Sequence, residues 1–308
     1  MTQTSAPTAD TVRRLVRSLL PDGGGTRIAP VAEGGGQCTW FVGTRHVLRI
    51  APDREAARRR WRELRLRDLV RPHVGVAVPV SVAHGEWAPG LTYTLDRLIP
   101  GGSAERRDVS AVGEADLAGL LTGVREVPGH QAEALGVPRA APRSLEALRT
   151  AAERAAGRLA AADEFDPARL HRLTPPAVVQ LAPQQGAALL VHHGLRGEHL
   201  LVDGDGRVRG VLGWTDAVVG DPTEDIAGLA LAVGAPAAVR AATLAGYGVR
   251  PCLRGLWLAR CDTLTRLADR LHRHDSSLPL LRAQLRRSWE AILLERVTEF
   301  RDGTDDPL

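Results

Sequence analysis

A polar turn between two apolar runs carries residue types that acid–base chemistry needs. The stretch VHHGLRGEHLLV (191–202) places three histidines and one glutamate in a single loop. Histidine titrates near neutral pH and a carboxylate can exchange a proton, so His192, His193 and Glu198 are candidate acid–base residues. Imidazole is also a common metal ligand, and His199 is the candidate metal contact. A turn histidine is more often solvated than coordinating, which argues against a zinc site.

The apolar runs on either side of this loop indicate short strands. They predict a compact β-turn-β unit from Ala187 to Leu212. Around this unit the chain is expected to be helical, at 114–125, at 143–163 and in three helices after residue 223.

The N-terminal part of the chain predicts a helix followed by an antiparallel sheet. Asp10 can cap a helix whose apolar positions recur at helical spacing. A second helix is expected from Asp53 to Val70, with Trp61, Leu64 and Leu66 on or near its buried side and its arginines mainly solvated. The expected strands are 39–43, 46–51, 76–85 and 91–101.

The turn Pro100-Gly101-Gly102 is a natural break between these two parts. We therefore expect an N-terminal lobe over 1–100 and a helical C-terminal lobe over 101–308. Such a bilobal α+β architecture makes the cleft between the lobes the default ligand site.

The composition argues against a disulfide-rich protein, a cysteine-based metal protein and a membrane protein. The chain is 44% hydrophobic and 25% charged, and its three cysteines are widely spaced, so neither a disulfide framework nor a cysteine-based metal site is indicated. No apolar run is long enough for a membrane helix and no signal peptide is visible, so we expect a cytoplasmic protein.

Arginine supplies all 40 basic residues, and both lysine and asparagine are absent. Lysine and asparagine have AT-rich codons, so their absence suggests a GC-rich bacterial genome. This codon bias, together with the permanent charge of arginine, accounts for the sequence pI of 9.6. The arginines are spread along helices and do not cluster with aromatic residues, which argues against a nucleic-acid partner.

Several motifs occur in the order found in one known family. HHGLRGEH (192–199), LGWTDA (212–217) and GDPTEDIA (220–227) follow LDRLIPG (95–101) and VPGHQAEALGVP (127–138). The chain thereby resembles the aminoglycoside and macrolide phosphotransferase family. That resemblance implies a bilobal, protein-kinase-like α+β fold, with a small antiparallel-sheet N-terminal lobe and a larger helical C-terminal lobe.

The resemblance also implies a nucleotide site for ATP or GTP with Mg²⁺. Arg49 stands at the strand position that grips the phosphates, and Glu63 at the helix position that holds this basic residue. Gly34, Gly35 and Gly36 could lie over phosphates through their main-chain N–H groups. In relatives of this kind, Asp221 and Asp225 correspond to residues that brace the catalytic loop.

Two glycines occupy the positions at which the family carries its key carboxylates. Gly194 stands where the catalytic aspartate belongs, and Gly213 where the metal-binding aspartate belongs. A positioned base contributes about 10²–10⁴ in rate, and the metal adds charge stabilisation. The loop 191–216 is therefore predicted to be a degenerate catalytic loop.

Four hypotheses follow. The favoured one is a pseudokinase-like protein that binds a small molecule, such as an antibiotic or a natural-product intermediate, without converting it. A second is an enzyme of different chemistry that uses His192, His193 and Glu198. A third is an active phosphotransferase in which Asp216 or Glu198 substitutes for the missing carboxylates. The fourth is a module that regulates a protein partner.

Overall fold

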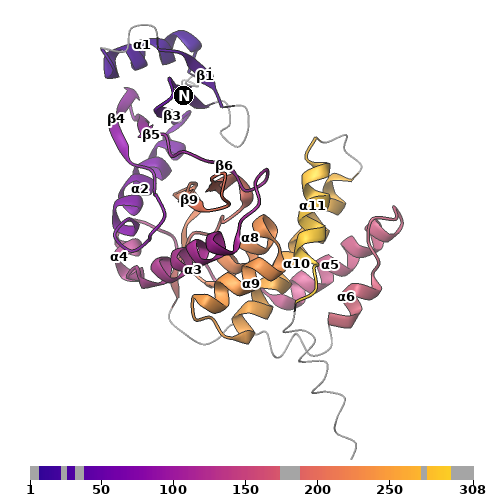
Figure 1. Ribbon diagram of the computed structural model, residues 1–308. Coiled ribbons are helices and arrows are strands. Elements are labelled where there is room, and N and C mark those ends of the chain that lie inside the picture. Colours follow the sequence, from indigo (N-terminus) through magenta and orange to yellow (C-terminus); the bar gives the residue numbers. More distant parts are fainter. Residues whose placement is uncertain (1–6, 22–25, 32–37, 174–187, 272–275, 293–308) are drawn as a thin grey trace, which may run out of the picture.

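A computed structural model describes residues 7–21, 26–31, 38–173, 188–271 and 276–292. A small sheet with two flanking helices forms one part of the molecule, and a larger, mainly helical part packs beside it (Figure 1). This is the mixed architecture expected from the sequence, with a small antiparallel sheet and many helices.

The sheet contains five antiparallel strands in the order β1-β2-β3-β5-β4. The central strands β3 and β5 are rich in β-branched and apolar residues, and Arg49 pairs there with Thr94 and Leu48 with Leu95. The strands are β1 (Ile28–Pro30), β2 (Thr39–Val42), β3 (His46–Ile50), β4 (Ser81–Ala88) and β5 (Leu91–Arg97). The strand expected at 76–85 thus begins later, because Pro79 precedes it and has no N–H for a sheet ladder.

Each face of the sheet is covered by one helix. Helix α1 (Ala9–Leu19) places Val12 and Val16 in a hydrophobic core with Trp40, Leu48 and Tyr93. Helix α2 (Arg54–Val70), capped by Asp53, covers the opposite face and carries charged residues into it. Successive side chains along a strand point to opposite faces of the sheet. Leu48 therefore faces α1, and the neighbouring Arg49 faces α2.

The predicted burial of α2 is partly wrong. Leu66 is buried, but Trp61 is exposed and meets His84 edge to face. Arg67, expected among the solvated arginines, is 2% exposed. The inward face of α2 is therefore partly ionic.

The helical part surrounds the main hydrophobic core, to which α2 also contributes Leu66 and Val70. Four helices follow residue 223 in the described ranges, where three were expected. The helices are α3 (Ala111–Glu126), α4 (Gly129–Ala134), α5 (Leu145–Ala160), α6 (Ala168–Leu173), α8 (Thr223–Val233), α9 (Ala235–Leu244), α10 (Val249–Arg270) and α11 (Leu278–Ser288). Within the described residues, no helix is both long and apolar enough to cross a membrane.

The expected β-turn-β unit at 187–212 divides between two sheets. Strand β7 (Leu189–Val191) pairs with β10 (Val218–Gly220), whereas β8 (Leu200–Val202) pairs with β6 (Gly102–Ser103) and β9 (Val208–Val211). The loop between β7 and β8 therefore joins two sheets.

Candidate functional site

The loop after β7 is held by a carboxylate from α8. Asp225 accepts hydrogen bonds from the main-chain N–H groups of His192 and His193, at 2.9 and 2.8 Å. Burial raises the pKa of Asp225 to about 7, although both N–H groups oppose this shift. His193 adopts a left-handed conformation with φ of 62°, and its side chain is exposed. These contacts fix the path of the loop at its first turn.

His192 is fully buried and packs against the indole of Trp214, with the ring centroids 4.5 Å apart. Its Nε2 donates to the carbonyl oxygen of Leu212 at 2.8 Å, while its buried Nδ1 has no partner among the described residues. Burial, aided by His199, lowers the pKa of His192 to about 3. This neutral, enclosed ring is better suited to joining two loops than to exchanging protons with a ligand.

The imidazole of His199 lies beside both Gly194 and Gly213, the two glycines predicted from the sequence to stand at the family's carboxylate positions. Its Nδ1 donates to the carbonyl oxygen of Gly194 at 2.5 Å. A β-carbon added to Gly194 would lie 3.5 Å from this ring, an ordinary contact. At Gly213, where φ is +82°, an added β-carbon would lie only 2.6 Å from the ring. His199 thus fills the space beside Gly213 that a side chain there would need.

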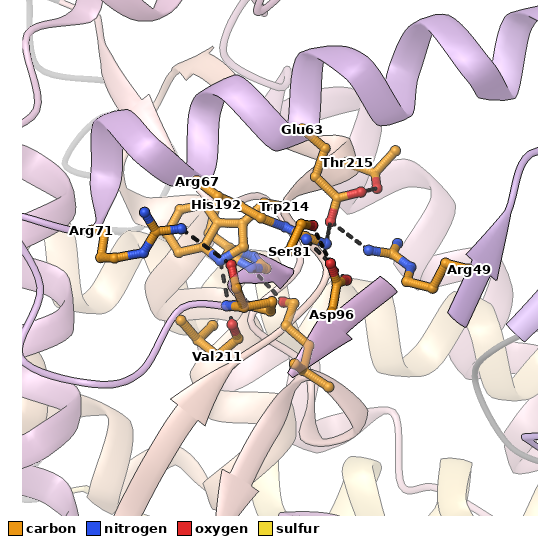
Figure 2. Close-up of polar contacts among 12 residues, drawn as sticks. Arg49, Glu63, Arg67, Arg71, Ser81, Asp96, His192, Val211, Trp214 and Thr215 are labelled. Carbon is orange, nitrogen blue, oxygen red and sulfur yellow. Dashed lines mark hydrogen bonds and ion pairs between the residues drawn. The ribbon is translucent and has the colours of Figure 1, made fainter. Parts of the chain in front are cut away.

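An ionic cluster lies between α2 and strands β3 and β5, close to Thr215 and His192 (Figure 2). Arg49 on β3 contacts Glu63 on α2 at 2.9 Å, and Arg67 contacts the same carboxylate oxygen. Burial opposes ionisation of Glu63, but Arg49 and Arg67 outweigh it, so the pKa of Glu63 lies well below its ordinary value. Arg67 also reaches Asp96 on β5 at 3.1 Å.

Glu63 also links the sheet to the loop that contains Gly213. The hydroxyl of Thr215 donates to the second oxygen of Glu63 at 2.8 Å, and Arg62 donates to the carbonyl oxygen of Thr215 at 3.0 Å. The two residues that follow Gly213 therefore contact structural partners: Trp214 packs on His192, and Thr215 on Glu63.

The remaining candidates are not gathered at one point. Asp216 is exposed and Glu198 is half-buried. Asp221 forms an ion pair with Arg254 at 2.7 Å and accepts from the main-chain N–H of Thr223 at the start of α8. Gly34, Gly35 and Gly36 lie outside the described residues.

Sequence reasoning missed Arg67 and Asp96, which form ion pairs in this cluster, and Arg60, whose charge is influenced by Arg49 and Glu63. A signal for two of them was present, since Arg60 and Arg67 lie three residues before and four residues after Glu63 and so share its face of the helix. Asp96 follows the alternation of β5, on the same side as Thr94.

The residues of this site fit a phosphate better than a magnesium ion. Magnesium prefers carboxylate and water oxygens in an octahedral arrangement. Gly194 and Gly213 supply no side-chain oxygen, and His199 occupies the adjoining space. Across the described ranges, no group of three histidine, cysteine or acidic residues is arranged to hold a metal ion. The Arg49–Glu63 pair, in contrast, is the arrangement expected of a phosphate-gripping residue and its holder.

Comparison with protein-family models gives a match over residues 27–258 to the phosphotransferase enzyme family. The chain belongs to this family. Comparison with curated proteins gives no match.

Solved structures with the same fold include phosphotransferases of two antibiotic classes. The GDP complex of wild-type aminoglycoside 2'-phosphotransferase-IIIa is 17% identical, with a TM-score of 0.66, covering 90% of this chain and 97% of that one. Macrolide 2'-phosphotransferase MphH from Brachybacterium faecium is 22% identical, with a TM-score of 0.57 and coverage of 87% and 98%. At these identities the likeness establishes the fold.

Proposed function

We propose that this family member binds a small molecule in the cleft between its two parts without transferring a phosphoryl group to it. The observation that carries the proposal is the pair Gly194 and Gly213, with the ring of His199 beside both. A phosphotransferase relies on positioning and charge neutralisation, and neither glycine offers a proton acceptor or a metal ligand.

The scaffold around these glycines supports binding. Asp225 holds the loop, and Arg49, which the sequence resemblance assigns to the phosphates, is paired with Glu63. Structures of the same fold are described with GDP, kanamycin, gentamicin, and streptomycin with ATP. Nucleotides, aminoglycosides and macrolides are therefore the first ligands to test.

The test combines calorimetric titration with product analysis. ATP and GTP are titrated with and without Mg²⁺, followed by an aminoglycoside and macrolide panel, and each mixture is then examined by mass spectrometry. Saturable binding of unchanged ligand supports the proposal. A magnesium-dependent phosphorylated product contradicts it and makes the chain an active phosphotransferase.

The same assay distinguishes the proposed binding function from the alternative, an enzyme that uses acid–base chemistry. A mass change other than phosphorylation, lost in His193→Ala, would contradict the binder and favour an enzyme of different chemistry. The enclosed, neutral state of His192 does not favour this second function, because a general acid or base must reach the reacting atom.

A further inference from the structure

The face of α2 that covers the sheet contains an excess of positive charge. Three guanidinium groups, from Arg49, Arg60 and Arg67, act on one another there together with two carboxylates, from Glu63 and Asp96. The two carboxylates are already engaged: Glu63 by Arg49, Arg67 and Thr215, and Asp96 by Arg67. One positive charge is therefore left without an acidic counterpart in this cluster.

Arg60 carries that uncompensated charge. Its Nε and Nη1 are buried, and neither has a hydrogen-bond partner among the described residues. Burial, reinforced by the neighbouring Arg49, lowers the pKa of Arg60 to about 10. Buried guanidinium nitrogens normally have acceptors, because an unpaired charged donor is costly to remove from water.

The position of Arg60 is fixed by its neighbours on both sides. The hydroxyl of Thr92 lies 3.5 Å from the carbonyl oxygen of Ala57, and Arg67 reaches Asp96, so α2 runs along β5 with Arg60 between these two contacts. Thr94 lies on the same stretch of β5, is the cross-strand neighbour of Arg49, and has a buried hydroxyl without a partner in the described structure. An unsatisfied hydroxyl thus adjoins Arg49 on the neighbouring strand, and the unsatisfied guanidinium of Arg60 on the helix lies near enough to be influenced by the charge of Arg49.

The absence of carboxylates at Gly194 and Gly213 also makes the site more positively charged. A family site with aspartates at both glycine positions would gather divalent cations, which then neutralise phosphates. Here those aspartates are absent, while Arg60 adds a fixed cation beside Arg49. Guanidinium groups neutralise and orient oxyanions directly, through two parallel N–H donors.

We infer that Arg49 and Arg60 form a site for a phosphate-type oxyanion that binds without a divalent metal ion. The inference rests on the proposed function, since it names the chemical class of ligand for the same cleft. The oxyanion can come from a nucleoside triphosphate or from a free phosphate chain, and the two sources share this recognition chemistry.

The test is calorimetric titration of the full chain with ATP, GTP, tripolyphosphate and inorganic phosphate, in buffer containing EDTA and in buffer containing Mg²⁺. Arg60→Gln is compared with Arg58→Gln, which removes one charge from the exposed side of the same helix. We expect binding in EDTA that weakens at least about tenfold in Arg60→Gln and less than about twofold in Arg58→Gln. Arg60→Lys should retain part of the affinity, because it keeps the charge but loses the planar fork.

Thermal unfolding without ligand separates binding from folding. Arg60→Gln removes an uncompensated buried charge, so its unfolding midpoint should equal or exceed that of the wild type. Either result of the titration supports the oxyanion site: tighter binding of ATP or GTP than of tripolyphosphate identifies a nucleoside triphosphate as the ligand, and equal binding of all three identifies the phosphate chain alone.

Binding that requires Mg²⁺, unchanged affinity in Arg60→Gln, or no binding of any probe overturns the inference. In the last case, binding of an unconverted aminoglycoside or macrolide would still uphold the proposed function, whereas a phosphorylated product would overturn the proposed function itself.

Discussion

At the scale of single residues, Gly194 and Gly213 are not equivalent, although the sequence predicts the same kind of position for both. Gly194 has room for a side chain and a backbone conformation that other residues adopt, whereas Gly213 is left-handed and lies against His199. We expect Gly213→Ala to lower the free energy of unfolding by at least about 1–2 kcal/mol, from the left-handed backbone alone. Gly194→Ala should change it by less than about 1 kcal/mol. Urea unfolding of both variants provides the measurement.

The part of the Gly213 effect that comes from His199 can be isolated. In a His199→Ala background the collision is removed while the left-handed backbone remains, so the cost of Gly213→Ala should become smaller. An equal cost in both backgrounds would show that the imidazole does not fill this space.

His192 predicts a defined pH dependence of stability. Its pKa is about 3 in the folded chain, against an ordinary value of 6.5, so the unfolded chain takes up a proton first as pH falls. The stabilisation is complete above the unfolded value and is lost progressively as pH falls below it, by about 1.4 kcal/mol per pH unit. Between about pH 7.5 and about pH 5.5, wild type should therefore lose about 1.4 kcal/mol more than His192→Gln. Parallel urea titrations check this, and identical losses would mean that the folded His192 titrates normally.

At the scale of elements, the local sequence pattern predicts those helices and strands whose formation depends on residues adjacent in the chain. The antiparallel strands and the helix over 54–70 follow from alternation and capping residues. Pairing between distant segments was not predictable in this way: β7 has the same apolar signal as β8, yet its partner is β10. Likewise, the charge pattern of α2 does not reveal that Asp96 on β5 makes Arg67 a buried residue.

The link between α8 and the loop after β7 depends on Asp225. Replacing it with alanine leaves the buried N–H of His192 and the part-buried N–H of His193 without this acceptor, which should cost about 1–3 kcal/mol. Hydrogen exchange at His192 and His193 should accelerate before that of the α8 interior. Asp216→Ala, at an exposed position, is the control and should have little effect. Unchanged exchange at both histidines in Asp225→Ala would mean that the loop is held by other contacts.

At the scale of the whole molecule, the sheet and the helical part are joined by both apolar and polar contacts. Leu66 and Val70 of α2 belong to the main core, although their helix covers the small sheet. On the polar side, Glu63 joins Arg49 of the sheet to Thr215 of the loop that follows β9. These contacts should make the two parts unfold together.

Glu63 is consequently the residue at which the polar connection can be tested. Glu63→Gln removes the buried carboxylate shared by Arg49 and Arg67, and breaking such a pair costs about 3–5 kcal/mol. Glu55→Gln, on the exposed side of the same helix, should cost less than about 1 kcal/mol. Thr215→Val removes only the hydroxyl contact, so its cost should lie between these two values. Calorimetric unfolding measures all three variants, and a loss in Glu63→Gln no larger than in Glu55→Gln would show that the charge cluster does not couple the two parts.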